Sequence, residues 1–156
     1  MSTGPYVLTV NGSITNHGVL DHADYAQYVS SAPVAFRDGL NKTTAELTAT
    51  SGADLEYATV LVTMGENPPA CGAQDFPVTP ILRHFDVAPA AGVEATLRLH
   101  YDLSEANGLN PDDVVMYHCN GTQWEALVGP ITRGSQNGMN FVEVAGVSSF
   151  SPFRCV

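Results

Sequence analysis

The chain has 156 residues, enough for one domain with a hydrophobic core and too few for two ordinary domains. Apolar residues make up 44% and charged residues 14%, with 14 glycines and 10 prolines, which excludes a disordered chain and a framework of long helices. The formal charge of −10, from 16 acidic against six basic residues, argues against nucleic acid and anionic lipid as partners, because phosphate binding requires a concentrated positive patch.

The composition indicates an exported protein. The opening residues, MSTGPYVLTV, contain no basic region followed by an apolar one, and no apolar run approaches the roughly 20 residues of a membrane-spanning helix, so we expect no membrane insertion. Thr, Ser, Asn and Gly are abundant and Lys42 is the only lysine, a balance typical of exported β-proteins. We therefore expect a mature or excised piece of a secreted protein.

The first 31 residues differ from the remainder of the chain. YVLTV at 6–10 alternates apolar and polar residues as a strand does, and LTVNGS is echoed by ITNHGV directly after it. Short repeats of this kind build stacked coils. We expect residues 1–31 to be the end of a repetitive stalk or an exchanged strand, and residues 32–156 to form the folded domain.

Alternation with a period of two dominates the middle of the chain. It runs through residues 43–50, 55–64 and 93–103, which are rich in the Val, Thr, Tyr and Leu residues that suit a half-buried strand. In the last of these segments Leu99 faces one way and His100 the other, as in an extended strand. The irregular stretch at 64–80 contains four prolines and is expected to form a surface loop.

Turn signals follow in the second half. Asn120-Gly121 lies between two alternating runs and predicts a type I′ turn of two residues that joins strands at 113–119 and 122–128. SQNGMN at 135–140 marks another turn before the strand FVEVAGV.

One short helical turn is expected near 104–109, where Ser104 can act as its N-cap and Gly108 can end it. Otherwise strands recur at intervals of about 10–15 residues, with Gly, Pro and Asn between them. This spacing predicts an all-β fold, an antiparallel β-sandwich of the immunoglobulin-like or jelly-roll-like kind.

Cysteines and histidines offer two kinds of site. Cys71, Cys119 and Cys155 allow three alternative disulfides with one thiol left over, and the odd number also allows a bond to another chain. His17 and His22 have the side chains for a transition metal, but their spacing matches no established metal motif, so a polar loop is the favoured interpretation.

Four carboxylates crowd into one connection, at Asp102, Glu105, Asp112 and Asp113. Calcium prefers such oxygen ligands, although the spacing is not that of an EF-hand. The alternative, which we favour, is local: Asp102 and Glu105 stabilise the start of the helical turn, and the remaining acids belong to a tight turn. Apart from this calcium ion, no cofactor is expected.

Aromatic rings suggest a sugar-binding surface. Trp124, Tyr117 and Tyr101 are candidates for stacking on a ligand. Trp124, the only tryptophan, follows directly after the turn at Asn120-Gly121 and can point into the core as readily as outward. Core packing is the commoner outcome and the favoured one.

No pattern of residues predicts catalysis. GVSSF at 146–150 lacks the second glycine of the GxSxG turn, and no helix is expected after it. Carboxylates that cleave a glycosidic bond must face each other across a cleft, whereas these lie in one short connection. We therefore expect no catalytic residues and no enzymatic activity.

Short motifs occur in a characteristic order along the second half. They are Arg83-His84-Phe85, Tyr101-Asp102, Asn107-Gly108-Leu109, Met116-Tyr117, Gly121, Trp124 and the closing block GVSSFSPF at 146–153. With this order, residues 32–153 resemble a module found at or near the end of large secreted and cell-surface proteins of bacteria, notably filamentous and gliding kinds. Cys119 and Cys155 are not part of that pattern and suggest an added disulfide.

The resemblance implies a non-catalytic extracellular β-sandwich in which GVSSFSPF is the last strand. Val147 and the phenylalanines are then expected in the core. Pro152 lacks an N–H donor, so an edge or a bulge is its expected position.

These observations predict a structural or adhesive module of a bacterial surface protein. Its partners would be other copies of itself or the preceding repeats of a larger protein, and a fibre would form if residues 5–20 added as a strand to a neighbouring sandwich. The alternative is a carbohydrate-binding module that binds polysaccharide and holds a structural calcium ion. Both place the protein outside the cell or on its surface.

Overall fold

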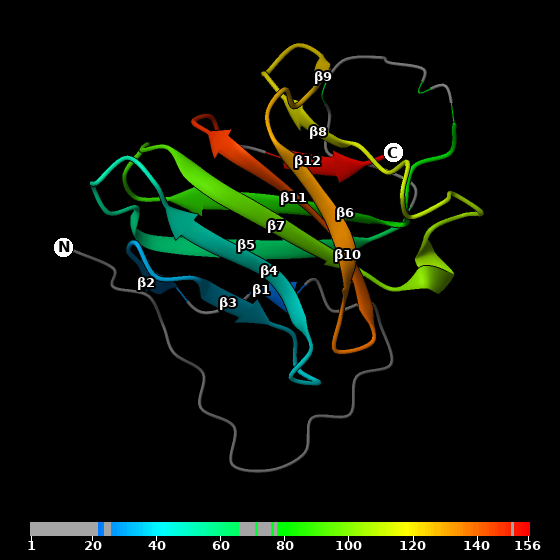
Figure 1. Cartoon of the computed structure of the whole chain (residues 1–156), viewed down its shortest axis with the longest axis horizontal. Helices are drawn as coiled ribbons and strands as arrows, with labels where there is room; N and C mark the ends of the chain where they lie inside the picture. Colours follow the sequence, from blue (N-terminus) through cyan, green and yellow to red (C-terminus); the bar gives the residue numbers. More distant parts are fainter. Residues whose placement is uncertain (1–21, 24–25, 66–70, 72–75, 77, 151) are drawn as a thin grey trace, which may run out of the picture.

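The computed structural model of the chain describes residues 22–23, 26–65, 71, 76, 78–150 and 152–156. Over these residues the protein is an antiparallel β-sandwich, in which a seven-stranded sheet packs against a five-stranded sheet and one short 3-10 turn joins two strands (Figure 1). The predicted all-β sandwich is confirmed. Within the same residues, no helix has the length and apolar character needed to span a membrane.

Both sheets are built from strands that are distant in sequence. The seven-stranded sheet runs in the spatial order β1 (His22–Ala23), β5 (Glu56–Met64), β6 (Arg83–Pro89), β12 (Pro152–Cys155), β8 (Met116–Cys119) and β9 (Trp124–Ala126), with β2 (Gln27–Val29) beside β5 on the β1 side. The five-stranded sheet runs β10 (Ile131–Gln136), β11 (Met139–Val147), β7 (Ala95–Tyr101), β4 (Thr43–Ala49) and β3 (Val34–Arg37).

Three predicted strands, at 43–50, 55–64 and 93–103, correspond to β4, β5 and β7 with slightly shorter bounds. The strand expected at 6–10 lies outside the described residues. β2 pairs with β5 and its Val29 is fully buried, so the sandwich includes chain that precedes residue 32.

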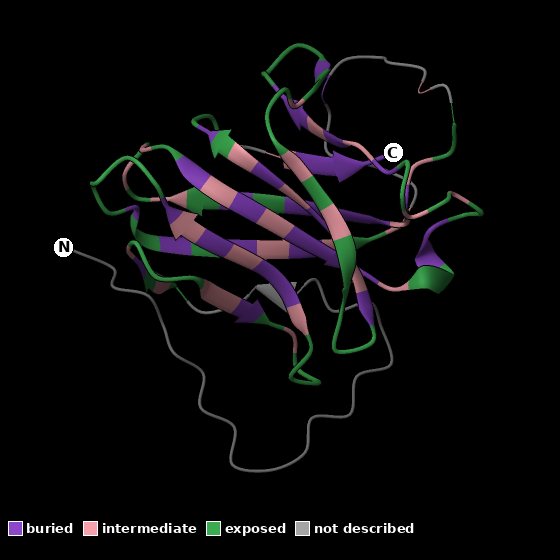
Figure 2. Cartoon of the chain, viewed as in Figure 1, coloured by how far each residue is buried: buried purple, intermediate pink, exposed green. Residues whose placement is uncertain are grey.

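The core lies between the sheets and is formed by alternate residues of the strands. Figure 2 shows this alternation as buried and less buried bands along β4 and β7. Leu47 on β4 is paired with Leu97 on β7, and both are fully buried in one core cluster with Phe85 and Phe153 of the other sheet. The alternation of apolar and polar residues along the strands therefore accounts for the core-facing side of each sheet.

The hairpin predicted around Asn120-Gly121 is confirmed, but its turn type is wrong. β8 and β9 are joined by four residues, 120–123, and Asn120 does not adopt a positive φ. The side chain of Asn120 accepts hydrogen bonds from the backbone N–H groups of Thr122 and Gln123, at 2.9 and 3.0 Å, and these bonds stabilise the longer turn.

The two-residue turn occurs instead at Asn137-Gly138, between β10 and β11. Both residues have positive φ, 53° and 79°, as a type I′ turn requires, and the flanking Gln136 and Met139 are paired. This hairpin places polar side chains at one end of the five-stranded sheet.

The helical turn is the 3-10 turn η1 (Leu103–Glu105), and its N-cap is Asp102, so the prediction of Ser104 as cap is wrong. Asp102 accepts a hydrogen bond from the backbone N–H of Ser104 at 3.0 Å, and Glu105 accepts one from the backbone N–H of Asp102 at 3.1 Å. This reciprocal arrangement is a capping box, and it moves the start of the turn two residues earlier than expected.

The closing segment is divided between the two sheets. Val147 is the last residue of β11, and the chain then crosses to the other sheet, where β12 lies between β6 and β8. The prediction of an edge or a bulge for Pro152 is therefore wrong; it is the first residue of an interior strand, a position where a missing N–H is tolerated. Val147 and Phe153 are buried in the core as expected.

Candidate ligand-binding site

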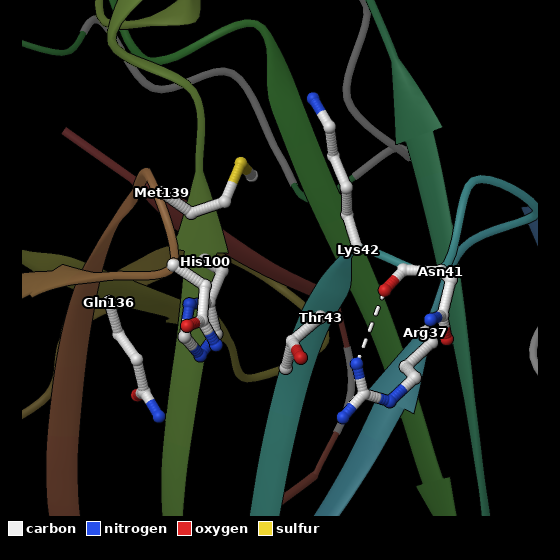
Figure 3. A pocket seen from close by; sticks show the side chains of 8 residues that line it. Arg37, Asn41, Lys42, Thr43, His100, Gln136 and Met139 are labelled. Carbon is white, nitrogen blue, oxygen red and sulfur yellow. Dashed lines mark hydrogen bonds between the residues drawn. The ribbon is translucent and has the colours of Figure 1, made fainter.

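A cavity of about 200 Å³ lies at the end of the five-stranded sheet, on the face turned away from the core. The β3–β4 connection and the β10–β11 hairpin lie beside each other there (Figure 1). The cavity is lined by Arg37, Asn41, Lys42, Thr43, His100, Gln136, Asn137 and Met139 (Figure 3). His100 belongs to the outer face because it alternates with the core residues Leu99 and Tyr101 on β7.

His100 is only 1% exposed, although it lies on the outer face of its strand. Among the described residues neither of its ring nitrogens has a hydrogen-bond partner, and Nε2 is 3.5 Å from Oε1 of Glu46, too far for a good hydrogen bond. Burial, together with the charges of Arg98 and Arg83, lowers the pKa of His100 from 6.5 to about 4. The imidazole is therefore neutral near pH 7, with one N–H donor and one acceptor nitrogen.

Arg98 organises the wall beside His100. Its guanidinium lies 4.2 Å from the ring centre of Phe141 and forms ion pairs with Glu143 at 2.8 Å and Glu46 at 3.3 Å. It also donates a hydrogen bond of 2.8 Å to Oε1 of Gln136. The amide of Gln136 also carries an NH₂ group, which can donate.

The opposite wall is the β3–β4 connection, which is held by its own hydrogen bonds. The Asp38 carboxylate accepts from the backbone N–H of Lys42 at 2.9 Å, and Arg37 donates to the backbone carbonyl of Asn41 at 3.2 Å. Figure 3 shows the Arg37 guanidinium beside Thr43, with the Lys42 side chain extending away from it. The cavity thus has cationic, amide and hydroxyl groups around a neutral imidazole.

Three of the four carboxylates proposed for calcium have partners within the protein. Glu105 forms a buried ion pair of 2.7 Å with Arg83, and Asp102 caps η1. Asp113 accepts a hydrogen bond of 3.0 Å from the side-chain amide of Asn110. The Asn110 side chain also accepts a hydrogen bond from the backbone N–H of Asp112. In the part of the chain that the structure describes, no three His, Cys, Asp or Glu side chains form a group able to hold a metal ion.

The histidines proposed for a transition metal cannot be placed. His17 lies outside the described residues. For His22 only the backbone is described, in β1.

A disulfide joins Cys71 to Cys119, with their Cα atoms 5.8 Å apart, which selects one of the three predicted pairings. It attaches the proline-rich loop to the end of β8. Cys155 is a free thiol buried in the core, and burial raises its pKa to about 12, so it stays protonated and out of reach of another chain.

The three rings proposed to stack on a ligand are engaged in packing. Tyr101 is fully buried in the main core, and Trp124 is 4% exposed in a second cluster with the disulfide. Tyr117 packs edge-on against Phe76, with ring centres 5.2 Å apart. The burial of Tyr101 and Trp124 contradicts their use as a stacking surface, whereas core packing, the favoured alternative for Trp124, describes its position.

Sequence reasoning overlooked His100 and the residues around it. A histidine on an outward-facing strand position is usually exposed, and the two connections that line the cavity with this one are not adjacent to it in sequence. The only local signal was the Asn137-Gly138 turn, which fixes one of the covering hairpins. The chain has no significant match to a protein-family model, a curated protein or a solved structure.

Proposed function

We propose that the chain is a non-catalytic extracellular module of a bacterial surface protein, with a structural or adhesive role. The Cys71–Cys119 disulfide carries this proposal, because disulfides persist outside the cell and are rare in the cytosol. The two-sheet framework and the order of motifs in the C-terminal half support it, since both fit the end modules of secreted bacterial proteins that the sequence resembles.

The location is tested on the bacterium that produces the protein. Antibodies against the sandwich should label intact cells as strongly as lysed cells, with a cytoplasmic marker labelled only after lysis. Non-reducing peptide mapping of the native protein should recover the peptide pair joined through Cys71 and Cys119. Labelling that requires lysis, with both cysteines found as thiols, would refute the proposal.

Assembly into a fibre is the more specific form of this proposal. β10 and β3 are the outer strands of the five-stranded sheet, and an unpaired edge can accept a strand from another molecule. Sedimentation at high concentration should show polymers for the whole chain and monomers for a chain lacking residues 5–20. Monomers in both cases would exclude the fibre without affecting the surface location.

Carbohydrate binding is the second candidate, favoured by an exposed aromatic pair. Tyr28 and Tyr57 are 50% and 61% exposed, with ring centres 5.5 Å apart, and the Tyr28 hydroxyl donates to Asp54 at 2.7 Å. Exposed rings of this kind can stack on sugars. A glycan array should give binding that the variant Y28A/Y57A loses and that V128A, at another exposed apolar residue, retains; loss on adding a chelator would support the calcium ion.

A further inference from the structure

Two connections between strands contain the same motif, Asn-X-Thr, in which X is not proline. It occurs at Asn41-Lys42-Thr43 and at Asn120-Gly121-Thr122. This motif is the acceptor sequence for N-linked glycosylation. We propose that Asn41 and Asn120 are attachment sites for N-linked sugar. The inference goes beyond the structural role above and holds whether or not the module forms fibres. A related tripeptide at 11–13 lies outside the described residues and is not part of the proposal.

Both motifs lie at the surface. Asn41 and Lys42 are exposed in the β3–β4 connection of the five-stranded sheet, and residues 120–122 are all exposed in the β8–β9 turn of the seven-stranded sheet (Figure 2). An attached sugar is bulky and hydrophilic, so the asparagine that carries it must lie outside the core. Neither attachment would disturb the packing between the sheets.

Asn41 has a fixed backbone and an amide available for reaction. Its N–H donates to the carbonyl of Asp38 at 2.9 Å, and its own carbonyl accepts from Arg37 at 3.2 Å. Its φ of 63° lies in the left-handed region that asparagine tolerates. Its side chain forms no hydrogen bond with another described residue. A sugar on this amide would therefore replace no contact within the described part of the chain.

Asn120 is hydrogen-bonded within its turn and still has an N–H group to offer. Its Oδ1 accepts from the backbone N–H and the hydroxyl of Thr122, both at 2.9 Å, and from the backbone N–H of Gln123 at 3.0 Å. Its Nδ2 donates to Oε1 of Glu125 at 2.6 Å. A side-chain amide carries two N–H donors, so the second can be replaced by a sugar while these four hydrogen bonds persist. The hydroxyl that the motif requires already contacts the amide that would be modified.

The attachment is a group transfer without a change of oxidation state. The amide nitrogen attacks the anomeric carbon of a sugar carried on a diphosphate. The bond from that carbon to the phosphate oxygen breaks, the diphosphate leaves with the electron pair, and one amide proton passes to a base of the transferase. The producing cell supplies the glycosyl diphosphate and the transferase, and the chain supplies the acceptor nitrogen and the hydroxyl two residues later.

The modification is tested by peptide mapping of the protein purified from the cells that produce it, with fragmentation that keeps sugars on their peptides. We expect the peptides containing Asn41 and Asn120 to be heavier by one or more sugar units. One sugar supports a nucleotide-linked donor, and an oligosaccharide supports a lipid-linked donor. Asn137 is exposed in an Asn-Gly turn but is followed by Met139 at the third position, so its peptide is the internal control and should be unmodified. Unmodified masses at both motifs overturn the proposal, and an unmodified mass at one motif removes that site.

Threonine substitutions distinguish the motif from the asparagine itself. Thr122→Ala keeps Asn120 and removes the hydroxyl, so we expect the sugar to be lost from Asn120 and retained at Asn41. Thr43→Ala should give the reverse result. Thr122→Ser and Thr43→Ser keep a hydroxyl and are the matched controls, in which both sugars should be retained. The melting temperature of each variant checks that it is folded. Sugars that persist at Asn120 in Thr122→Ala and at Asn41 in Thr43→Ala would overturn the assignment to these motifs, without bearing on the location of the protein.

Discussion

The Cys71–Cys119 disulfide is expected to supply a large part of the stability of the sandwich. The two cysteines are 48 residues apart in sequence, and in the chain-entropy description closing a loop of that length restricts the unfolded chain by about 4 kcal/mol at 25 °C. Whole domains are stable by only about 5–15 kcal/mol. Replacing both cysteines with alanine (C71A/C119A) should therefore leave a protein that folds but is markedly less stable.

The change is measured by urea denaturation and by thermal melting. For a domain of this size a loss of 1 kcal/mol lowers the melting temperature by about 2–4 °C, so the double variant should melt about 8–16 °C lower than the parent chain. Each single variant, C71A or C119A, should lose nearly the same amount as the double variant, because either substitution removes the same bond.

Reduction provides the matched control for this experiment. A reductant should lower the melting temperature of the parent chain toward that of C71A/C119A and should leave the double variant unchanged. The reasoning would be refuted if the oxidised parent and the double variant unfolded at the same urea concentration, since the loop closed by this bond would then make no difference to the unfolded state.

Three further predictions concern single residues. Glu105→Gln leaves the Arg83 charge buried without its carboxylate, and we expect a loss of about 3–5 kcal/mol in urea unfolding; a loss below about 1 kcal/mol would show that the pair is not effectively buried. The pKa of His100 is lowered to about 4 in the folded protein, so as the pH falls the unfolded chain binds a proton before the folded one does. The free energy of unfolding should therefore decrease by up to about 3 kcal/mol as the pH falls from 6.5 to about 4. Denaturation curves at several pH values should show this loss in the parent chain and not in H100F, and parallel curves for the two would contradict it. Gly138→Ala should cost about 1–2 kcal/mol through its positive φ alone, because a Cβ there meets no other atom within 4 Å; equal stability would argue against the type I′ turn.

The layers of the fold could be predicted because their signal is local. In β7 every second residue is apolar, and Leu97 and Leu99 reach the core through that alternation alone. The same rule cannot identify partners across the sheets, since neighbours such as β6 and β12 are far apart in sequence. Pattern therefore predicted strands such as β4, β5 and β7 with their inner faces, and long-range packing decided the order of the strands in each sheet.

The two Asn-Gly pairs show the limit of a local rule even for turns. At Asn137-Gly138 both residues adopt the positive φ that the dipeptide favours, and the strands pair directly on either side. At Asn120-Gly121 the paired residues are Cys119 and Trp124, which are held by the disulfide and the second apolar cluster, and the turn is longer. Tertiary contacts thus determined which dipeptide formed the two-residue turn.

The candidate site could not be predicted for a similar reason. His100 is an ordinary outward-facing residue by its position on β7, and the sequence predicted only that it faces away from the core. It is buried, and it lines one cavity together with two separate connections, which supply Asn41 and Asn137. A site assembled from three segments leaves no spacing pattern in the chain, whereas the predicted carboxylates were conspicuous because they are neighbours in sequence.

The closing segment explains why the chain ends with so few charges. A strand at a free edge is commonly protected from further pairing by charged residues, and none occurs between Gly146 and Arg154. β12 needs no such protection, because β6 pairs with one side of it and β8 with the other. Phe153 faces the core, while the Arg154 guanidinium lies 5.8 Å from the ring of Phe76 on the opposite side. Among the described strands of its sheet, the β8–β9 hairpin pairs with the others only through β12, so β12 is an interior connection between two parts of the sheet.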